Sequence, residues 1–140
     1  MKASEVDHLV DAGPLAGAFW PGDQWHSWSR ATLSGLRGPA CTTETVFAEA
    51  AHLLKRHSPA LFALFAAVEA GLVRFRPVYP EHLARAAQLI SRYASYADTA
   101  DASLVILSEL HPCARLITLD KRDFSVYRRK DGRPVPCIVP

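Results

Sequence analysis

The stretch that decides the fold is Leu116-Ile117-Thr118-Leu119-Asp120-Lys121-Arg122-Asp123-Phe124. Its first residues are mostly apolar and predict a short buried strand that ends at Asp120. A carboxylate directly beyond a buried strand is costly to desolvate unless it has a partner. In open parallel α/β sheets, ligands bind in the crevice beyond the carboxyl ends of the strands. Asp120 therefore marks a candidate site, and other acids at strand ends are expected to join it.

Asp11 occupies the same kind of position near the start of the chain. Residues 6–10 predict a first strand, and Asp11 follows it directly. Pro14 then suits the first turn of a helix, where its missing N–H costs nothing. If the strands before Asp11 and Asp120 are neighbours at the centre of the sheet, the two carboxylates converge at a topological switch point.

The rest of the chain alternates between helical and strand patterns and predicts a single domain over residues 1–140. Helices are predicted to begin near Asp23, Thr43, Ser58, Pro80 and Asp98. Further strands are predicted over residues 39–42, 72–78 and 135–139, the last at an edge, with a turn and loop over 121–131. This order indicates a three-layer α/β/α domain around a mostly parallel sheet.

Three further acids stand at positions that could serve a site. Glu49 lies mid-helix beside an apolar stripe, where its carboxylate either reaches solvent or meets a cation. Asp98 and Asp101 are three residues apart at the start of a helix, so both point from the same side. A helix cap with a second acid in the first turn explains one of these two aspartates better than both.

Composition narrows the function classes. Half of the chain is apolar (49%), yet no apolar run approaches the roughly 18 residues of a membrane span, and the first residues do not resemble a secretory signal. Three cysteines without C-x-x-C spacing, and six histidines without an H-E-x-x-H pattern, argue against a disulfide framework or a zinc site. These features predict a cytoplasmic protein in a reducing compartment.

The end of the chain is basic. From residue 115 onward it carries seven basic residues and three acids, which suits a phosphate-bearing partner. The candidates for phosphate contacts are Arg115, Lys121, Arg122, Arg128 and Arg129.

Several carboxylates packed together repel one another unless cations share them. Hard oxygen ligands with vacant positions suit Mg²⁺ or Mn²⁺, which keep waters and bind substrate phosphates. Such a centre can orient a water and stabilise the charge that develops in phosphodiester cleavage. The sequence holds no G-x-S-x-G and no phosphate-cradling glycine loop that would point to another mechanism.

Four motifs in this order resemble a PIN domain and, more narrowly, the VapC-type toxin of a bacterial or archaeal toxin–antitoxin pair. They span almost the whole chain: Leu9-Val10-Asp11, then T-x-x-V-x-x-E from Thr43 to Glu49, then residues 98–105 (DTADASLV), and finally residues 116–124 with Tyr127-Arg128 close behind.

The resemblance implies a five-stranded parallel sheet of order 3-2-1-4-5 and an endoribonuclease that depends on Mg²⁺ or Mn²⁺. The catalytic and metal-binding quartet that it implies is Asp11, Glu49, Asp101 and Asp120. Asp98 and Asp123 would be auxiliary metal-binding acids. Asp101 is favoured over Asp98 because the family's third acid directly precedes the Ala-x-apolar helix.

The same resemblance implies an RNA substrate cut by in-line attack of water, leaving a 5′-phosphate and a 3′-hydroxyl. It also implies a small antitoxin bound in an apolar groove near the early helices, where Trp25 and Trp28 are candidate contacts, and a homodimer. Two alternatives stay open: a receiver-like phosphoacceptor domain, in which Lys121 would be the lysine after a late strand, and a PIN-like module that binds a partner without cutting RNA.

Overall fold

The computed structural model describes residues 6–140 and contains one five-stranded sheet in which every pairing is parallel. The strand order is β3-β2-β1-β4-β5. The strands are β1 (His8–Val10), β2 (Ala40–Thr42), β3 (Val73–Phe75), β4 (Arg115–Ile117) and β5 (Cys137–Ile138). The predicted fold class, strand order and edge position of the last strand are therefore confirmed, and the sheet is parallel throughout.

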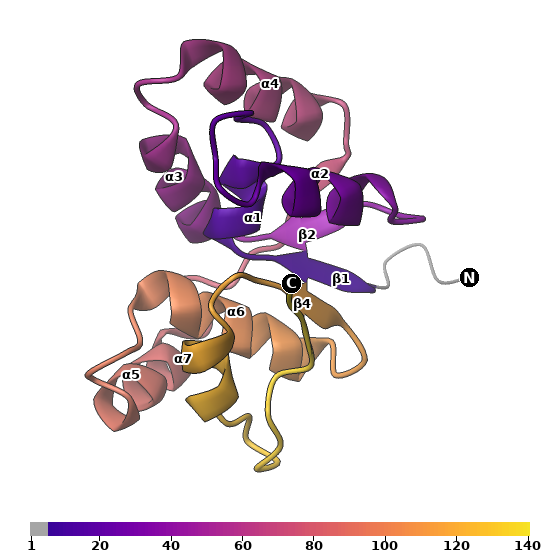
Figure 1. Ribbon diagram of the computed structural model, residues 1–140. Coiled ribbons are helices and arrows are strands. Elements are labelled where there is room, and N and C mark those ends of the chain that lie inside the picture. Colours follow the sequence, from indigo (N-terminus) through magenta and orange to yellow (C-terminus); the bar gives the residue numbers. More distant parts are fainter. Residues whose placement is uncertain (1–5) are drawn as a thin grey trace.

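Helices connect these strands and cover both faces of the sheet. They are α1 (Ala12–Gly17), α2 (His26–Ser34), α3 (Glu44–Leu53), α4 (Ser58–Glu69), α5 (Leu83–Arg92), α6 (Thr99–Leu110) and α7 (Lys121–Val126). Figure 1 shows α1 to α4 on one side of the sheet and α5 to α7 on the other. The chain builds the sheet outward from β1 to β3 and then returns past β1 to add β4 and β5 on the other side. Because the crossovers are right-handed, this reversal places the later helices on the opposite face.

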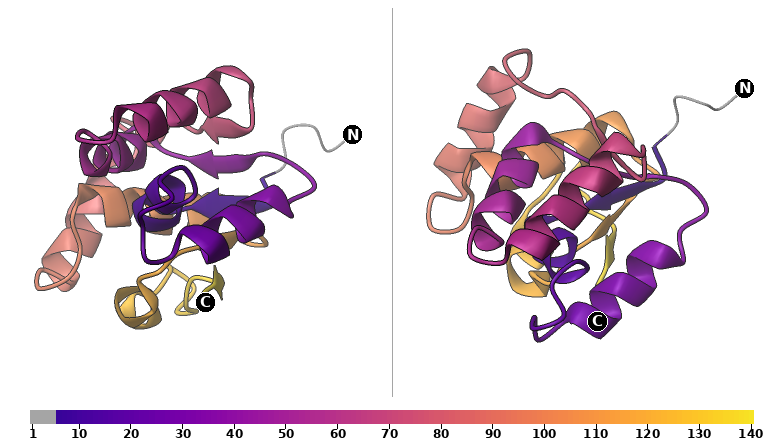
Figure 2. Two further views of the ribbon diagram at one scale, coloured as in Figure 1. Left: turned by 45° about the horizontal axis from the view of Figure 1, so that its top comes forward. Right: turned by 90° about the horizontal axis from the view of Figure 1, so that it is seen from above.

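The centre of the core is the pair β1 and β4 with α6 laid against both. Leu9 pairs with Leu116, and both side chains are fully buried. All residues of α6 from Ala102 to Ser108 are buried, as is typical of a helix that lies inside a domain rather than on its surface. The left view of Figure 2 shows α4 on one side of the sheet and α7 with the C-terminal segment on the other.

The strand predicted to end at Asp120 ends three residues earlier. Val10, the last residue of β1, pairs with Ile117, so the parallel ladder between β1 and β4 stops there. Asp120 is instead the N-cap of α7, whose Asp123 amide donates to Asp120 Oδ1 at 3.1 Å. The prediction of a loop over residues 121–131 is thus wrong for its first half, which is helical.

The predicted helix starts at Thr43, Ser58 and Asp98 are confirmed, and the helices predicted from Asp23 and Pro80 begin three residues later, at His26 and Leu83. Thr43 and Asp98 are the N-caps of α3 and α6, and each side chain accepts a hydrogen bond from a first-turn amide. The helix predicted from Asp23 begins at His26, because the Asp23 carboxylate caps a turn by accepting from the amide of Trp25 at 2.7 Å. α4 begins at the predicted Ser58, although its N-cap is the preceding residue.

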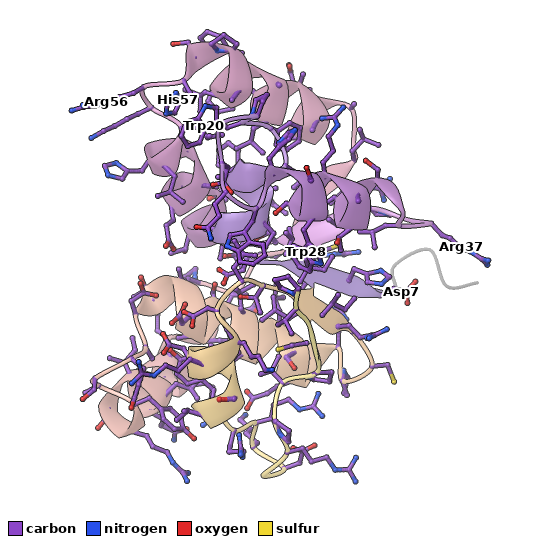
Figure 3. The ribbon with its side chains drawn as sticks, in the orientation of Figure 1. Asp7, Trp20, Trp28, Arg37, Arg56 and His57 are labelled. Carbon is purple, nitrogen blue, oxygen red and sulfur yellow. The ribbon has the colours of Figure 1, made fainter. Side chains whose placement is uncertain are left out.

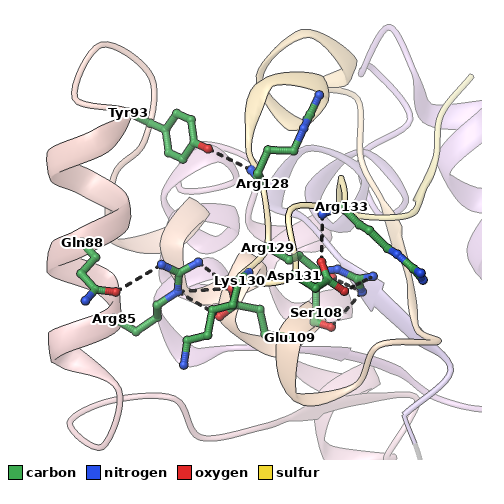
Figure 4. A network of polar contacts seen from close by, with 10 residues as sticks. All are labelled: Arg85, Gln88, Tyr93, Ser108, Glu109, Arg128, Arg129, Lys130, Asp131 and Arg133. Atoms are coloured by element: carbon green, nitrogen blue, oxygen red, sulfur yellow. Dashed lines mark hydrogen bonds and ion pairs between the residues drawn. The ribbon is translucent and has the colours of Figure 1, made fainter.

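A polar network ties the segment after α7 to α5 and α6 (Figure 4). Arg85 and Glu109 form a 2.6 Å ion pair with both side chains largely buried, and Glu109 also accepts from the amide of Lys130. The buried guanidinium of Arg129 donates to the carbonyls of Ser108 and Pro112 at the end of α6. A cation at a helix C-terminus is favourable because the last carbonyls carry partial negative charge.

Aromatic side chains join the early helices to α4. The rings of Trp20 and His57 stack with centroids 3.9 Å apart, and Figure 3 shows them between the loop after α1 and the start of α4. Of the two tryptophans predicted to line a groove, Trp28 packs partly against the core, whereas Trp25 is exposed.

Candidate metal centre

Asp11 is held between the two central strands. Its amide donates to the carbonyl of Ile117 at 3.0 Å and so completes the last β1–β4 pair, Val10 with Ile117. Its Oδ1 accepts from the amide of Ala12 at 2.8 Å, and its Oδ2 accepts from the hydroxyl of Thr118 at 2.8 Å. Burial nevertheless raises the pKa of Asp11, and the charges of Asp120 and Asp98 raise it further.

Thr118 links Asp11 to Asp120. The buried Thr118 hydroxyl donates to Asp11 and accepts from the amide of Asp120 at 2.9 Å. A single side chain therefore fixes the direction in which the chain leaves β4 and the orientation of the acid that follows β1. The half-buried Asp120 comes from the turn after β4, beside the end of β1, as the switch-point argument predicts.

Asp98 and Asp101 have different tasks at the start of α6. Asp98 is exposed and caps the helix, its Oδ1 accepting from the amide of Asp101 at 2.9 Å. Asp101 is half-buried, and its Oδ2 accepts a 2.6 Å hydrogen bond from the hydroxyl of Tyr127. The cap interpretation therefore accounts for Asp98, and Asp101 is the acid turned toward other side chains.

The electrostatics of Asp101 are those of an acid among acids. Burial raises its pKa to about 7, against the lowering effect of the Tyr127 hydrogen bond. Every charged neighbour among the described residues that shifts this pKa is another carboxylate: Asp98, Asp11 and Asp120. The pKa of Tyr127 is itself raised by burial and by Asp101, so the phenol keeps its proton and remains the donor.

Glu49 belongs to the same electrostatic cluster, and Glu44 lies elsewhere. Glu49 extends from the exposed side of α3, and partial burial together with the charges of Asp11 and Asp98 raises its pKa. Glu44, in the first turn of α3, lines a separate cavity beyond β2 and β3. The two glutamates of α3 therefore face different surroundings, and the role of Glu49 as a ligand stays a prediction.

Asp123 sits one turn into α7, directly beside Asp120. Burial raises its pKa, and the neighbouring Asp120 raises it further through a hydrogen bond and through charge. The six predicted acids therefore come from the ends of β1 and β4 and from α3, α6 and α7.

This donor set fits a hard divalent cation. The pKa values of Asp11, Glu49 and Asp101 are each raised in part by the negative charges of other aspartates in the cluster. A cation shared by these carboxylates would relieve that repulsion. All the donors are carboxylate oxygens, the ligands that Mg²⁺ and Mn²⁺ prefer. Within residues 6–140, no group of three or more His, Cys, Asp or Glu side chains is arranged so that it could hold a metal ion without rearrangement.

Two polar residues of the centre lie in or beside the last motif, but sequence reasoning assigned them no role. Thr118 stands inside the decisive stretch, and its place between a strand and an acid was the available signal. Tyr127 lies beyond α7, and nothing in the sequence shows where its hydroxyl points. A buried pair behind the acids, Thr43 Oγ1 and Ser103 Oγ at 2.9 Å, joins the start of α3 to α6.

The predicted phosphate contacts divide into exposed and internal side chains. Arg115, Lys121 and Arg122 are exposed, and their role stays a prediction. The prediction is wrong for Arg129, whose side chain is 7% exposed and bonded within the fold. Arg128 is half-buried and donates to the carbonyls of Ser125 and Tyr127 at the end of α7.

Comparison with known proteins agrees with this architecture. A model of the PIN domain family matches residues 9–130, and the chain therefore belongs to the PIN domain family. A comparison with curated proteins finds no match. Among solved structures, the chain resembles VapC20 of Mycobacterium tuberculosis, described as a toxin that cleaves the sarcin–ricin loop, with a TM-score of 0.69 and 19% identity over 79% of this chain and 87% of that one.

These findings bear on one of the two alternatives that the sequence left open, the receiver-like domain. A receiver domain has a different strand order and needs an acceptor aspartate at the end of its central strand. Membership in the PIN family and the order β3-β2-β1-β4-β5 therefore exclude the receiver-like alternative. No helix within residues 6–140 is long and apolar enough to cross a membrane.

Proposed function

We propose that this protein is an endoribonuclease dependent on Mg²⁺ or Mn²⁺ and the toxin of a toxin–antitoxin pair. The observation that carries the proposal is the cluster in which Asp11, Glu49, Asp101 and Asp120 couple through their charges at the carboxyl edge of the sheet. The raised pKa values of Asp11, Glu49 and Asp101 are costly for a fold that does not use them, and such groups concentrate at functional sites.

The chain's own residues would orient the oxygens of the centre. Thr118 and the amide of Ala12 fix the two carboxylate oxygens of Asp11, and Tyr127 fixes one oxygen of Asp101. When bound, the divalent cation would activate the attacking water and neutralise charge on the phosphate. Asp98 and Asp123 flank the quartet and are proposed as auxiliary acids. Asp101 is preferred to Asp98 as the third ligand because Asp98 is exposed and serves as the helix cap.

RNA is proposed as the substrate, with its phosphates against the exposed side chains of Arg115, Lys121 and Arg122. The fold similarity to a toxin described as cleaving the sarcin–ricin loop supports this choice of substrate class. A small antitoxin is the proposed partner. A cavity beside α2, lined by apolar side chains that include Phe19, Leu33 and Leu36, is a candidate place for it. We further propose that the protein is cytoplasmic and forms a homodimer. Light scattering of the purified protein would test the dimer.

The deciding experiment is cleavage of an end-labelled RNA by purified protein with Mg²⁺, with Mn²⁺ and with EDTA. Cleavage by wild type only with metal, and loss of cleavage in Asp11→Asn, is the expected result. Asp7→Asn is the matched control, because Asp7 is exposed before β1 and lies outside the cluster. A protein that binds metal and RNA without cutting any RNA would instead be a non-catalytic PIN module.

A further inference from the structure

Tyr127 follows the last acidic motif and reaches into the candidate centre. It follows directly after α7, and its side chain is 1% exposed. Its ring packs edge-on against Phe124 and Tyr93, with centroids 5.1 and 5.3 Å away. The ring is therefore held from α7 and from the end of α5, so the hydroxyl has one direction in which to point.

That direction is toward Asp101. The Tyr127 hydroxyl donates to Asp101 Oδ2 at 2.6 Å, the short distance of a charge-assisted hydrogen bond. The backbone of Asp101 is fixed at the same time, because its amide donates to Asp98 Oδ1. Asp101 is thus restrained at its backbone and at one carboxylate oxygen, and among the described residues no side chain bonds to Oδ1.

A phenol suits this task better than a cationic side chain. A lysine or arginine at position 127 would neutralise Asp101 and compete with a bound cation, whereas a neutral hydroxyl orients the carboxylate and leaves its negative charge in place. The hydroxyl of the neighbouring Tyr93 offers a contrast. It accepts from the amide of Arg128 at 3.1 Å and bonds to the backbone alone, as Figure 4 shows.

We propose that Tyr127 is a positioning residue that orients Asp101 so that Oδ1 faces a divalent cation. This inference rests on the proposed metal-dependent function. Residues that hydrogen-bond to metal ligands fix ligand orientation, and their loss weakens metal affinity by roughly 10- to 100-fold.

Calorimetric titration with Mn²⁺ of wild type, Tyr127→Phe and Tyr93→Phe tests the proposal. Tyr127→Phe is expected to raise the Kd for Mn²⁺ by roughly 10-fold or more. Tyr93→Phe removes an equivalent buried hydroxyl from the same aromatic cluster and is expected to keep the wild-type Kd while melting at a lower temperature. Equal Kd values for wild type and Tyr127→Phe, or equal losses in the two variants, would overturn the assignment.

Two further measurements separate the possible failures. In an Asp101→Asn background, Tyr127→Phe is expected to have no additional effect on Mn²⁺ affinity, because the residue through which it acts is already neutral. In NMR spectra of wild type, substoichiometric Mn²⁺ is expected to broaden the Tyr127 ring resonances, and their persistence would overturn the assignment without any variant. Wild type that binds no Mn²⁺ would overturn the proposed function and this inference together, whereas wild-type binding unchanged in Tyr127→Phe would overturn the inference alone.

Discussion

Thr118 donates a 2.8 Å hydrogen bond to Asp11 Oδ2, although the two residues are 107 positions apart in the chain. The contact crosses between the ends of β1 and β4, which are neighbours at the centre of the sheet. The same hydroxyl accepts from the amide of Asp120, so one buried oxygen sets the relative position of the first and last acids of the quartet.

Replacing Thr118 by valine keeps the shape and removes the hydroxyl. Asp11 Oδ2 and the amide of Asp120 then lose their partner, and we expect the free energy of unfolding to fall by about 1–3 kcal/mol. RNA cleavage is expected to fall by roughly 10- to 100-fold, since the orientation of a ligand is lost. Chemical denaturation and cleavage assays check these values. Thr118→Ser, which keeps the hydroxyl, should retain most of both, and an equally impaired serine variant would contradict the argument.

Asp120→Asn is expected to slow cleavage strongly while leaving the fold intact. Asparagine caps a helix about as well as aspartate, so α7 should keep its N-cap. The lost charge removes a proposed metal ligand, and we expect cleavage to slow by about two to three orders of magnitude, several kcal/mol in the barrier. Cleavage rates on a structured RNA with Mg²⁺, and circular dichroism for the fold, make the measurement. Near-equal rates for variant and wild type would remove Asp120 from the centre.

Glu49 and Glu44 form a matched pair on one helix, five residues apart. The charges of Asp11 and Asp98 raise the pKa of Glu49, whereas Glu44 lines a separate cavity beyond β2 and β3. We therefore expect Glu49→Gln to weaken Mn²⁺ binding by roughly 10-fold or more in calorimetry, and Glu44→Gln to leave it unchanged. The opposite pattern would mean that the motif is aligned wrongly by more than one helical turn.

Asp101→Asn should make the metal-free protein more stable. The carboxylate is surrounded by acids, and its amide keeps the volume and can still accept from Tyr127. In EDTA the variant is expected to melt above wild type. Saturating Mg²⁺, at about 100 times its Kd, should then raise the wild-type melting temperature by about 5–10 °C and that of the variant much less. A variant that melts lower in EDTA and responds equally to Mg²⁺ would make Asp101 a structural acid and move the ligand role to Asp98.

The raised pKa of Asp101 makes the stability of the metal-free protein depend on pH. Because the pKa of Asp101 rises from its ordinary 3.8 to about 7 in the fold, the folded state holds a proton in this window that the unfolded state has lost. Metal-free wild type should therefore lose stability as pH rises through the window from about 4 to about 7. Asp101→Asn should show a flatter profile in denaturant titrations in EDTA, and Asp7→Asn a profile like that of wild type. Identical slopes in all three proteins would contradict the raised pKa.

The sequence predicted the architecture well because its signals are local and independent. Asp11 follows a strand, Thr43 and Asp98 begin helices, and the parallel sheet follows from the alternation of elements. The end of β4 was misplaced because apolar residues continue past Ile117, and strand length is set by the partner strand β1 rather than by composition. Helix α7 was missed because it is short and rich in charge, although an acid at its N-cap and another three residues later were available signals.

The acids of the candidate site could be proposed from the sequence, but the residues that hydrogen-bond to them could not. Carboxylates at strand ends and helix starts can be found from position alone. The aim of the Tyr127 hydroxyl depends on the packing of its ring against Phe124 and Tyr93, which only the tertiary structure contains. The internal role of Arg129 was hidden for the same reason, since a basic residue in a basic tail is most simply read as exposed.

Residues 127–129 fasten α6 at both of its ends. Tyr127 bonds to Asp101 in the first turn, and Arg129 bonds to the carbonyl of Ser108, about 10 Å further along the helix axis. Helix α6 and residues 127–129 therefore form one cooperative unit. We expect the amide protons of α6 to exchange with solvent together rather than by fraying from either end of the helix. The rigidity of the acid at the edge of the sheet thus depends on a contact at the far end of the helix that carries it.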